Sequence, residues 1–108
     1  MERKLNTKEY ELLKYLLDFV EDYDFGIDNI KVVDMKDGGM GSLLFVSSNH
    51  KKNRKMSESI IEKQFNDADG VPISVCVNID EEKKLFELDI WRVDFNPVIR
   101  FPSRINVL

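Results

Sequence analysis

The stretch from Val71 to Phe101 constrains the fold more than any other part of this chain. The apolar residues of a first run alternate with polar ones, which is the pattern of a half-buried β-strand. They are Ile73, Val75, Val77 and Ile79. After a turn over residues 80–83, a second run alternates in the same way, at Phe86, Leu88 and Ile90. The sequence therefore predicts a β-hairpin with one apolar face.

The expected register of this hairpin places Ile79 opposite Lys84. The remaining apolar residues of the two strands then pair across the hairpin, as Val77 with Phe86, Val75 with Leu88 and Ile73 with Ile90. The opposite face of the second strand carries Glu87, Asp89 and Trp91.

An amphipathic helix is predicted near the N-terminus. Asn6 and Glu9 have the spacing of a capping box, so the helix should begin near Thr7. Its apolar stripe consists of Leu12, Leu13, Leu16, Leu17 and Val20. Because Gly26 can take the left-handed conformation that ends helices, we expect the helix to end between Asp22 and Phe25.

Three further strands complete the predicted fold. Ile30 to Met35 and Ser42 to Ser47 form a hairpin around a glycine-rich turn, and Ser57 to Phe65 is interpreted as a strand. The sequence thus predicts a single α+β domain over residues 1–108. In it, the N-terminal helix packs on one face of an antiparallel β-meander of about five strands.

Composition limits the classes of function. Of the 108 residues, 43% are hydrophobic and 33% are charged, which is enough for a core without disulfides. The net charge of −4 opposes general attraction to nucleic acid or anionic membrane, so we expect a protein partner, of basic charge. The single cysteine, Cys76, and the absence of a signal-peptide pattern or of roughly 18 consecutive apolar residues predict a cytoplasmic protein.

The glycine-rich segment Asp37 to Ser42 has two interpretations. Glycines at positions 38, 39 and 41 are what a hairpin turn requires. They would also let backbone N–H groups approach an anion. The residues of this possible ligand loop are Asp37, Gly38, Gly39, Gly41 and Ser42. A phosphate loop, however, continues into a helix, whereas this segment continues into a predicted strand.

No catalytic residue, metal site or cofactor is predicted. His50 is the only histidine and lies in a basic segment, residues 49–55, that is interpreted as an exposed loop. Asp67 to Gly70 has a fragment of a calcium-loop pattern but is interpreted as a turn. Glu87 and Asp89 could work as an acid–base pair, yet a single helix-on-sheet domain rarely builds the cleft that such enzymes need.

Trp91 beside Glu87 and Asp89 has the pattern of a binding anchor with charged surroundings. The leading hypothesis is a non-enzymatic interaction protein, either an immunity-type or a regulatory binder, that presents these three residues to a basic partner. The apolar tail over residues 96–108 could instead fold over this face, or could dock on a second chain to form a homodimer. The alternative function is a small-molecule or anion-binding domain that uses the glycine-rich loop.

The chain also resembles an uncharacterised family of small bacterial single-domain proteins. The matching segments are Arg3 to Leu17, Val33 to Leu44, Asp67 to Val71 and Glu87 to Pro97. The resemblance implies a bacterial origin and a domain of unknown function, with no assigned activity, cofactor or catalytic residue.

Overall fold

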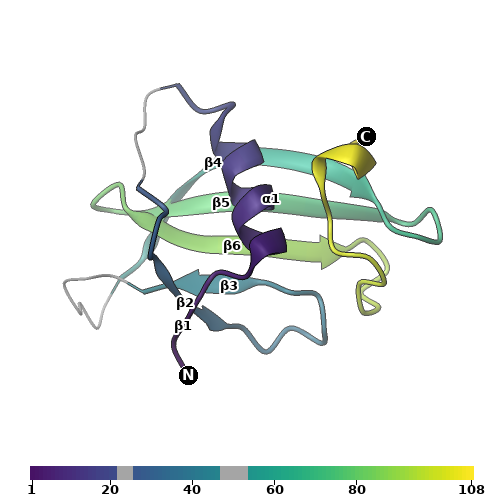
Figure 1. Cartoon of the computed structure of the whole chain (residues 1–108), viewed down its shortest axis with the longest axis horizontal. Coiled ribbons are helices and arrows are strands. Elements are labelled where there is room, and N and C mark those ends of the chain that lie inside the picture. The colour runs from purple at the N-terminus through teal and green to yellow at the C-terminus, as the bar shows by residue number, and fades with distance from the viewer. Residues whose placement is uncertain (22–25, 47–53) are drawn as a thin grey trace.

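The computed structural model describes residues 1–21, 26–46 and 54–108. Over these residues the chain forms a six-stranded antiparallel sheet with one α-helix across one of its faces (Figure 1). The elements are β1 (Arg3–Lys4), α1 (Thr7–Leu17), β2 (Lys31–Asp34), β3 (Leu43–Phe45), β4 (Met56–Asn66), β5 (Pro72–Asp80), β6 (Leu85–Arg92) and the short 3-10 helix η1 (Arg104–Asn106). In this part of the chain no helix is long and apolar enough to cross a membrane.

The α+β class and the N-terminal helix are as predicted, but the sheet has six strands rather than about five. The additional strand is β1, whose two residues pair with β2. Arg3 fixes it there, because its guanidinium group binds both Asp34 of β2 and Glu9 of α1. The strand order β1-β2-β3-β6-β5-β4 also departs from a simple meander, since β3 lies beside β6.

Helix α1 begins where the sequence predicts. The Asn6 side chain accepts a hydrogen bond from the backbone N–H of Glu9, and the Glu9 carboxylate accepts one from the N–H of Asn6. The predicted end was wrong, because the helix stops at Leu17. The N–H groups of Phe19 and Val20 bond three residues back and close the last turn tightly. Residues 22–25 lie outside the described part of the chain.

The β5–β6 hairpin has the predicted faces from Glu87 to Trp91 but not the predicted register, and Leu85 rather than the predicted Phe86 joins the core. Val75 lies opposite Ile90, and Val77 lies opposite Leu88, a shift of two residues from the expected pairs. The shift arises at the turn, where the Asp80 carboxylate accepts N–H bonds from Glu82 and Lys84, and from a bulge next to Ile79. A shift of two residues keeps the side chains from Glu87 to Trp91 on their predicted faces. The bulge lets Leu85 take the core position that was expected for Phe86.

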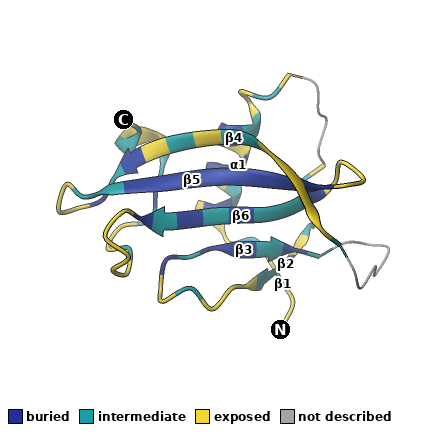
Figure 2. Cartoon of the chain, turned by 180° about the vertical axis from the view of Figure 1, so that it is seen from behind, coloured by how far each residue is buried: buried dark blue, intermediate teal, exposed yellow. Residues whose placement is uncertain are grey.

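The core lies between α1 and the sheet. It joins Leu12, Leu13 and Leu16 of the helix to buried residues of the strands, among them Phe45, Val75, Val77, Leu88 and Ile90. The C-terminal tail runs over the same side of the sheet as α1 (Figure 1). Seen from behind, the strands lie in front and neither α1 nor the tail crosses them (Figure 2). The tail therefore does not cover the face that carries Trp91.

Candidate functional site

The sheet face turned away from α1, called the outer face below, is built mainly by the side chains of β5 and β6. Three residues of β6 lie directly opposite three of β5: Glu87 opposite Asn78, Asp89 opposite Cys76, and Trp91 opposite Ser74. Because each of them is next in sequence to a residue of the core, all six side chains point to the outer face. The structure thus brings together the three residues that the sequence predicts as a binding surface.

Burial on the outer face is graded. Ser74, Cys76 and Asn78 on the interior strand β5 are buried, although no helix in the described part of the chain covers them. Glu87, Asp89 and Trp91 are only half-buried. The surface therefore has a closed polar base and a more accessible row of two carboxylates and one indole ring.

The two carboxylates lack positive partners within the described residues, where no ion pair includes Glu87 or Asp89. The Asn78 amide donates a hydrogen bond of 2.8 Å to Asp89. Burial nevertheless raises the pKa of Asp89, and the charge of Asp37 adds to the rise. Burial, followed by the charge of Asp89, also raises the pKa of Glu87. Both side chains would therefore gain from a cation placed beside them.

Cys76 lies beneath this row. Its thiol is 3.6 Å from the Asn78 amide oxygen. Burial, followed by the charge of Asp89, raises the pKa of Cys76 to about 11. A thiol with so high a pKa is a poor nucleophile at neutral pH, so Cys76 fills space in the base of the outer face.

The glycine-rich loop between β2 and β3 forms the predicted turn, with Gly38, Gly39 and Gly41 at positive φ. Its N–H groups already hold an anion, the carboxylate of Asp37, which accepts bonds from Met40, Gly41 and Ser42. Burial alone would raise the pKa of Asp37, but these bonds lower it. The Ser42 hydroxyl is engaged with the backbone of Ile90. This geometry leaves little for a bound anion to gain.

Arg92 is the centre of a polar cluster at the other end of β6. The sequence did not predict this cluster. The guanidinium group binds the carboxylates of Asp67, Asp69 and Asp94. Asp67 also accepts hydrogen bonds from the backbone N–H groups of Ile99 and Arg100. The cluster ties the β4–β5 turn, the end of β6 and the tail together, which makes it a structural feature.

The basic segment 49–55 lies largely outside the described residues, and His50 is among those not described. Arg54 is described, and its side chain is largely buried rather than exposed in a loop as predicted. Its guanidinium group binds Asp80 and the carbonyl groups of Phe45 and Leu85, and it lies over the Phe86 ring. Among the described residues no three His, Cys, Asp or Glu side chains are placed so that they could hold a metal ion.

The fold and the outer face define a small α+β domain with one covered and one open sheet face. A family model described as a domain of unknown function, DUF6984, matches residues 2–102. The chain belongs to this family, in agreement with the resemblance noted from the sequence. Neither a curated protein nor a solved structure matches the chain.

Proposed function

We propose that this protein is a non-enzymatic interaction domain that binds a basic partner protein through Glu87, Asp89 and Trp91. The observation that carries the proposal is the open outer face: α1 and the tail both lie on the other side of the sheet. An immunity-type or a regulatory binder would use such a surface. A buried, unpaired Cys76 accords with a cytoplasmic location.

The chemistry of the surface indicates the kind of partner. A lysine or arginine beside Glu87 and Asp89 would relieve the repulsion between two carboxylates whose pKa values are raised. The same cation, or an apolar side chain next to it, could pack on the Trp91 ring. Asp37, whose charge acts on Asp89, extends the acidic surface toward the β2–β3 loop.

The test compares three versions of the tagged full-length chain in affinity purification from the native host. They are the wild type, a Glu87→Gln/Asp89→Asn/Trp91→Ala variant, and a Glu21→Gln/Glu81→Gln control that removes two exposed charges elsewhere. A partner that is retained by the wild type and control but lost by the first variant, and that binds again as a purified protein, supports the proposal. A partner that binds all three equally contradicts it.

A second measurement can be made before the partner is identified. A short lysine- and arginine-rich peptide is titrated into isotope-labelled protein, and amide chemical shifts are followed by NMR. We expect the largest changes in β6 and β5 around positions 87–91 and 74–78. Changes confined to other acidic regions, or changes that persist in the triple variant, would exclude the outer face as the binding surface.

A further inference from the structure

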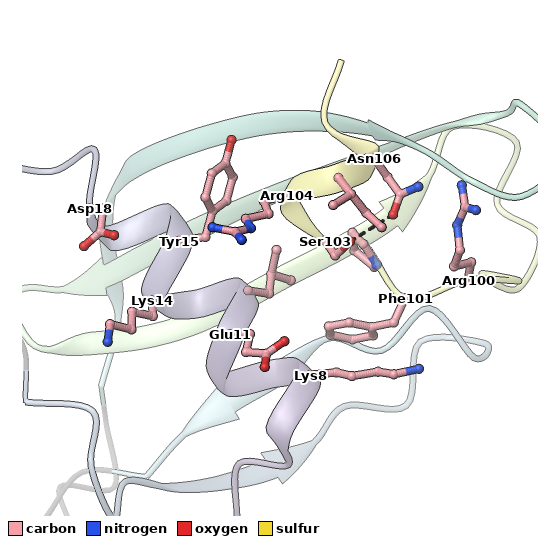
Figure 3. A pocket seen from close by; sticks show the side chains of 13 residues that line it. Lys8, Glu11, Lys14, Tyr15, Asp18, Arg100, Phe101, Ser103, Arg104 and Asn106 are labelled. Atoms are coloured by element: carbon pink, nitrogen blue, oxygen red, sulfur yellow. Dashed lines mark hydrogen bonds between the residues drawn. The ribbon is translucent and has the colours of Figure 1, made fainter.

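A groove of about 650 Å³ lies between α1 and the C-terminal tail, on the side of the molecule opposite the outer face (Figure 3). One wall is formed by residues of α1 and its C-cap, from Lys8 to Asp18, and the other by residues 100–106. Its volume is in the range of pockets that hold small molecules. The outer face does not contribute to it.

The tail wall is held in place by several contacts to the rest of the fold. The N–H groups of Ile99 and Arg100 bond the Asp67 carboxylate, and Leu108 donates its N–H to the Gln64 carbonyl group. Between these points, the side chains of Ser103 and Asn106 are joined by a hydrogen bond of 3.0 Å. The groove is therefore part of the folded structure.

The groove is basic, in contrast to the chain as a whole. Four of its lining residues are cationic and two are acidic: Lys8, Lys14, Arg100 and Arg104 against Glu11 and Asp18. In Figure 3, Arg104 extends from the tail toward α1, and the Glu11 carboxylate points from α1 toward Phe101. Lys8 runs past Phe101 in the direction away from Arg104, and Lys14 and Asp18 point away from the tail. Within the described residues, Lys8 and Arg104 form no ion pair. Arg104 is thus an available cation within the groove, and Lys8 is a second one at its other end, in a protein of net charge −4.

The groove also offers apolar surface. Leu12 and Pro102 are buried at its lining, Phe101 is half-buried, and Ile105 is 84% exposed beside it. We propose that this groove binds a small organic anion, with its apolar part against Phe101 and Ile105 and its negative group beside Arg104, while Lys8 adds positive charge at the other end of the groove. Such a groove favours a molecule that has both features, because an inorganic anion gains nothing from the apolar lining and a neutral apolar molecule gains nothing from the cations.

Two fluorescent probes with nearly the same apolar body test this proposal on the full chain. Anilinonaphthalenesulfonate carries a negative group, and phenylnaphthylamine lacks it. We expect saturable binding of the sulfonate, binding of the neutral probe weaker by about tenfold, and no displacement of the sulfonate by inorganic phosphate at equal concentration. Equal affinities for the two probes, no binding of the sulfonate, or its displacement by phosphate would overturn the proposal.

Substitutions place the binding on the molecule. A Lys8→Gln/Arg104→Gln variant should weaken sulfonate binding by about tenfold, whereas a Lys36→Gln/Lys84→Gln control, which removes two exposed charges elsewhere, should bind as the wild type does. All four positions are exposed, so folding should be preserved, and circular dichroism checks it. Equal weakening in both variants would mean that the sulfonate responds to the overall charge of the protein. NMR shift changes centred outside α1 and residues 100–106 would place it elsewhere on the molecule. Either result would contradict binding in the groove.

Discussion

The guanidinium group of Arg92 lies 3.0 Å from the carboxylate of Asp67, and both side chains are almost completely buried. Arg92 ends strand β6, directly after Trp91, and Asp67 begins the turn between β4 and β5. The same carboxylate binds the backbone of the tail at Ile99 and Arg100. This pair therefore determines where the tail lies, and with it the groove beside α1.

Replacing Asp67 should lower the free energy of unfolding more than replacing any of its exposed neighbours. The variant Asp67→Ala leaves Arg92 with less compensation in a buried site, so we expect a loss of about 3 kcal/mol in the free energy of unfolding. Urea denaturation measures this loss, and hydrogen exchange should show reduced protection of the Ile99 and Arg100 amides. The control Asp69→Ala, which removes a more exposed partner of Arg92, should lose about 1 kcal/mol or less. Similar losses in both variants would contradict a central role of Asp67.

Acid should weaken the same cluster in a defined range of pH. Burial alone would raise the pKa of Asp67, but hydrogen bonds from Ile99, Ala68, Arg100 and Arg92 lower it from 3.8 to about 2. A carboxylate whose folded pKa is lowered stabilises the folded state above its unfolded pKa. That contribution should disappear as the pH falls from about 4 to about 2. Comparing unfolding of the wild type and Asp67→Ala across this range checks it, because their difference in stability should shrink toward low pH.

Removing one charge from the outer face should stabilise the protein. The pKa of Glu87 is higher in the folded than in the unfolded protein, so its ionised form destabilises the folded state at every pH above the folded pKa. This destabilisation disappears as the pH falls toward the pKa of Glu87 in the unfolded state. We expect Glu87→Gln to raise the free energy of unfolding at neutral pH by a few tenths of a kcal/mol and at most about 1 kcal/mol. Thermal denaturation measures the change, with exposed Glu81→Gln as the control. A destabilised Glu87→Gln variant would mean that Glu87 supports the fold.

The thiol of Cys76 should react slowly in the folded protein. Burial and the charge of Asp89 raise its pKa from 9.0 to about 11, which lowers the thiolate fraction by about a hundredfold. Reaction with Ellman's reagent at mildly alkaline pH should therefore be slower than in urea-unfolded protein by at least about this factor. Equal rates in the two states would show that the base of the outer face opens readily.

Arg54 should be more important to stability than its place in a basic segment suggests. Lysine cannot reproduce the fork that binds Asp80 and the carbonyl groups of Phe45 and Leu85, so Arg54→Lys should cost about 2 kcal/mol. The exposed neighbour provides a control, because Lys55→Gln should change stability by less than about 0.5 kcal/mol. Chemical denaturation of both variants measures the difference.

The features that could be predicted from the sequence are those set by local periodicity. The alternation at Ile73, Val75 and Val77 fixed the faces of β5, and the Asn6–Glu9 pair fixed the start of α1. The register of the β5–β6 hairpin could not be predicted, because it depends on how the Asp80 side chain folds the turn and on the bulge beside it.

Contacts between distant segments were also beyond prediction. The prolines of the tail indicated an irregular chain, but its position depends on Asp67, which lies more than thirty residues earlier in the sequence. Glu87, Asp89 and Trp91 could be grouped from their spacing on one strand. Their polar base could be recognised only after Asn78 and Cys76 were placed opposite them. The groove escaped prediction because its two walls come from opposite ends of the chain.

The charge of the outer face also affects self-association of this protein. A twofold dimer through that face would be isologous, with each patch set against itself. It would therefore bring two copies of Glu87 and two of Asp89 together, although burial and like charge already raise their pKa values in one copy. Like-charge repulsion therefore disfavours a dimer through this face at neutral pH. The face stays accessible to a surface of opposite charge.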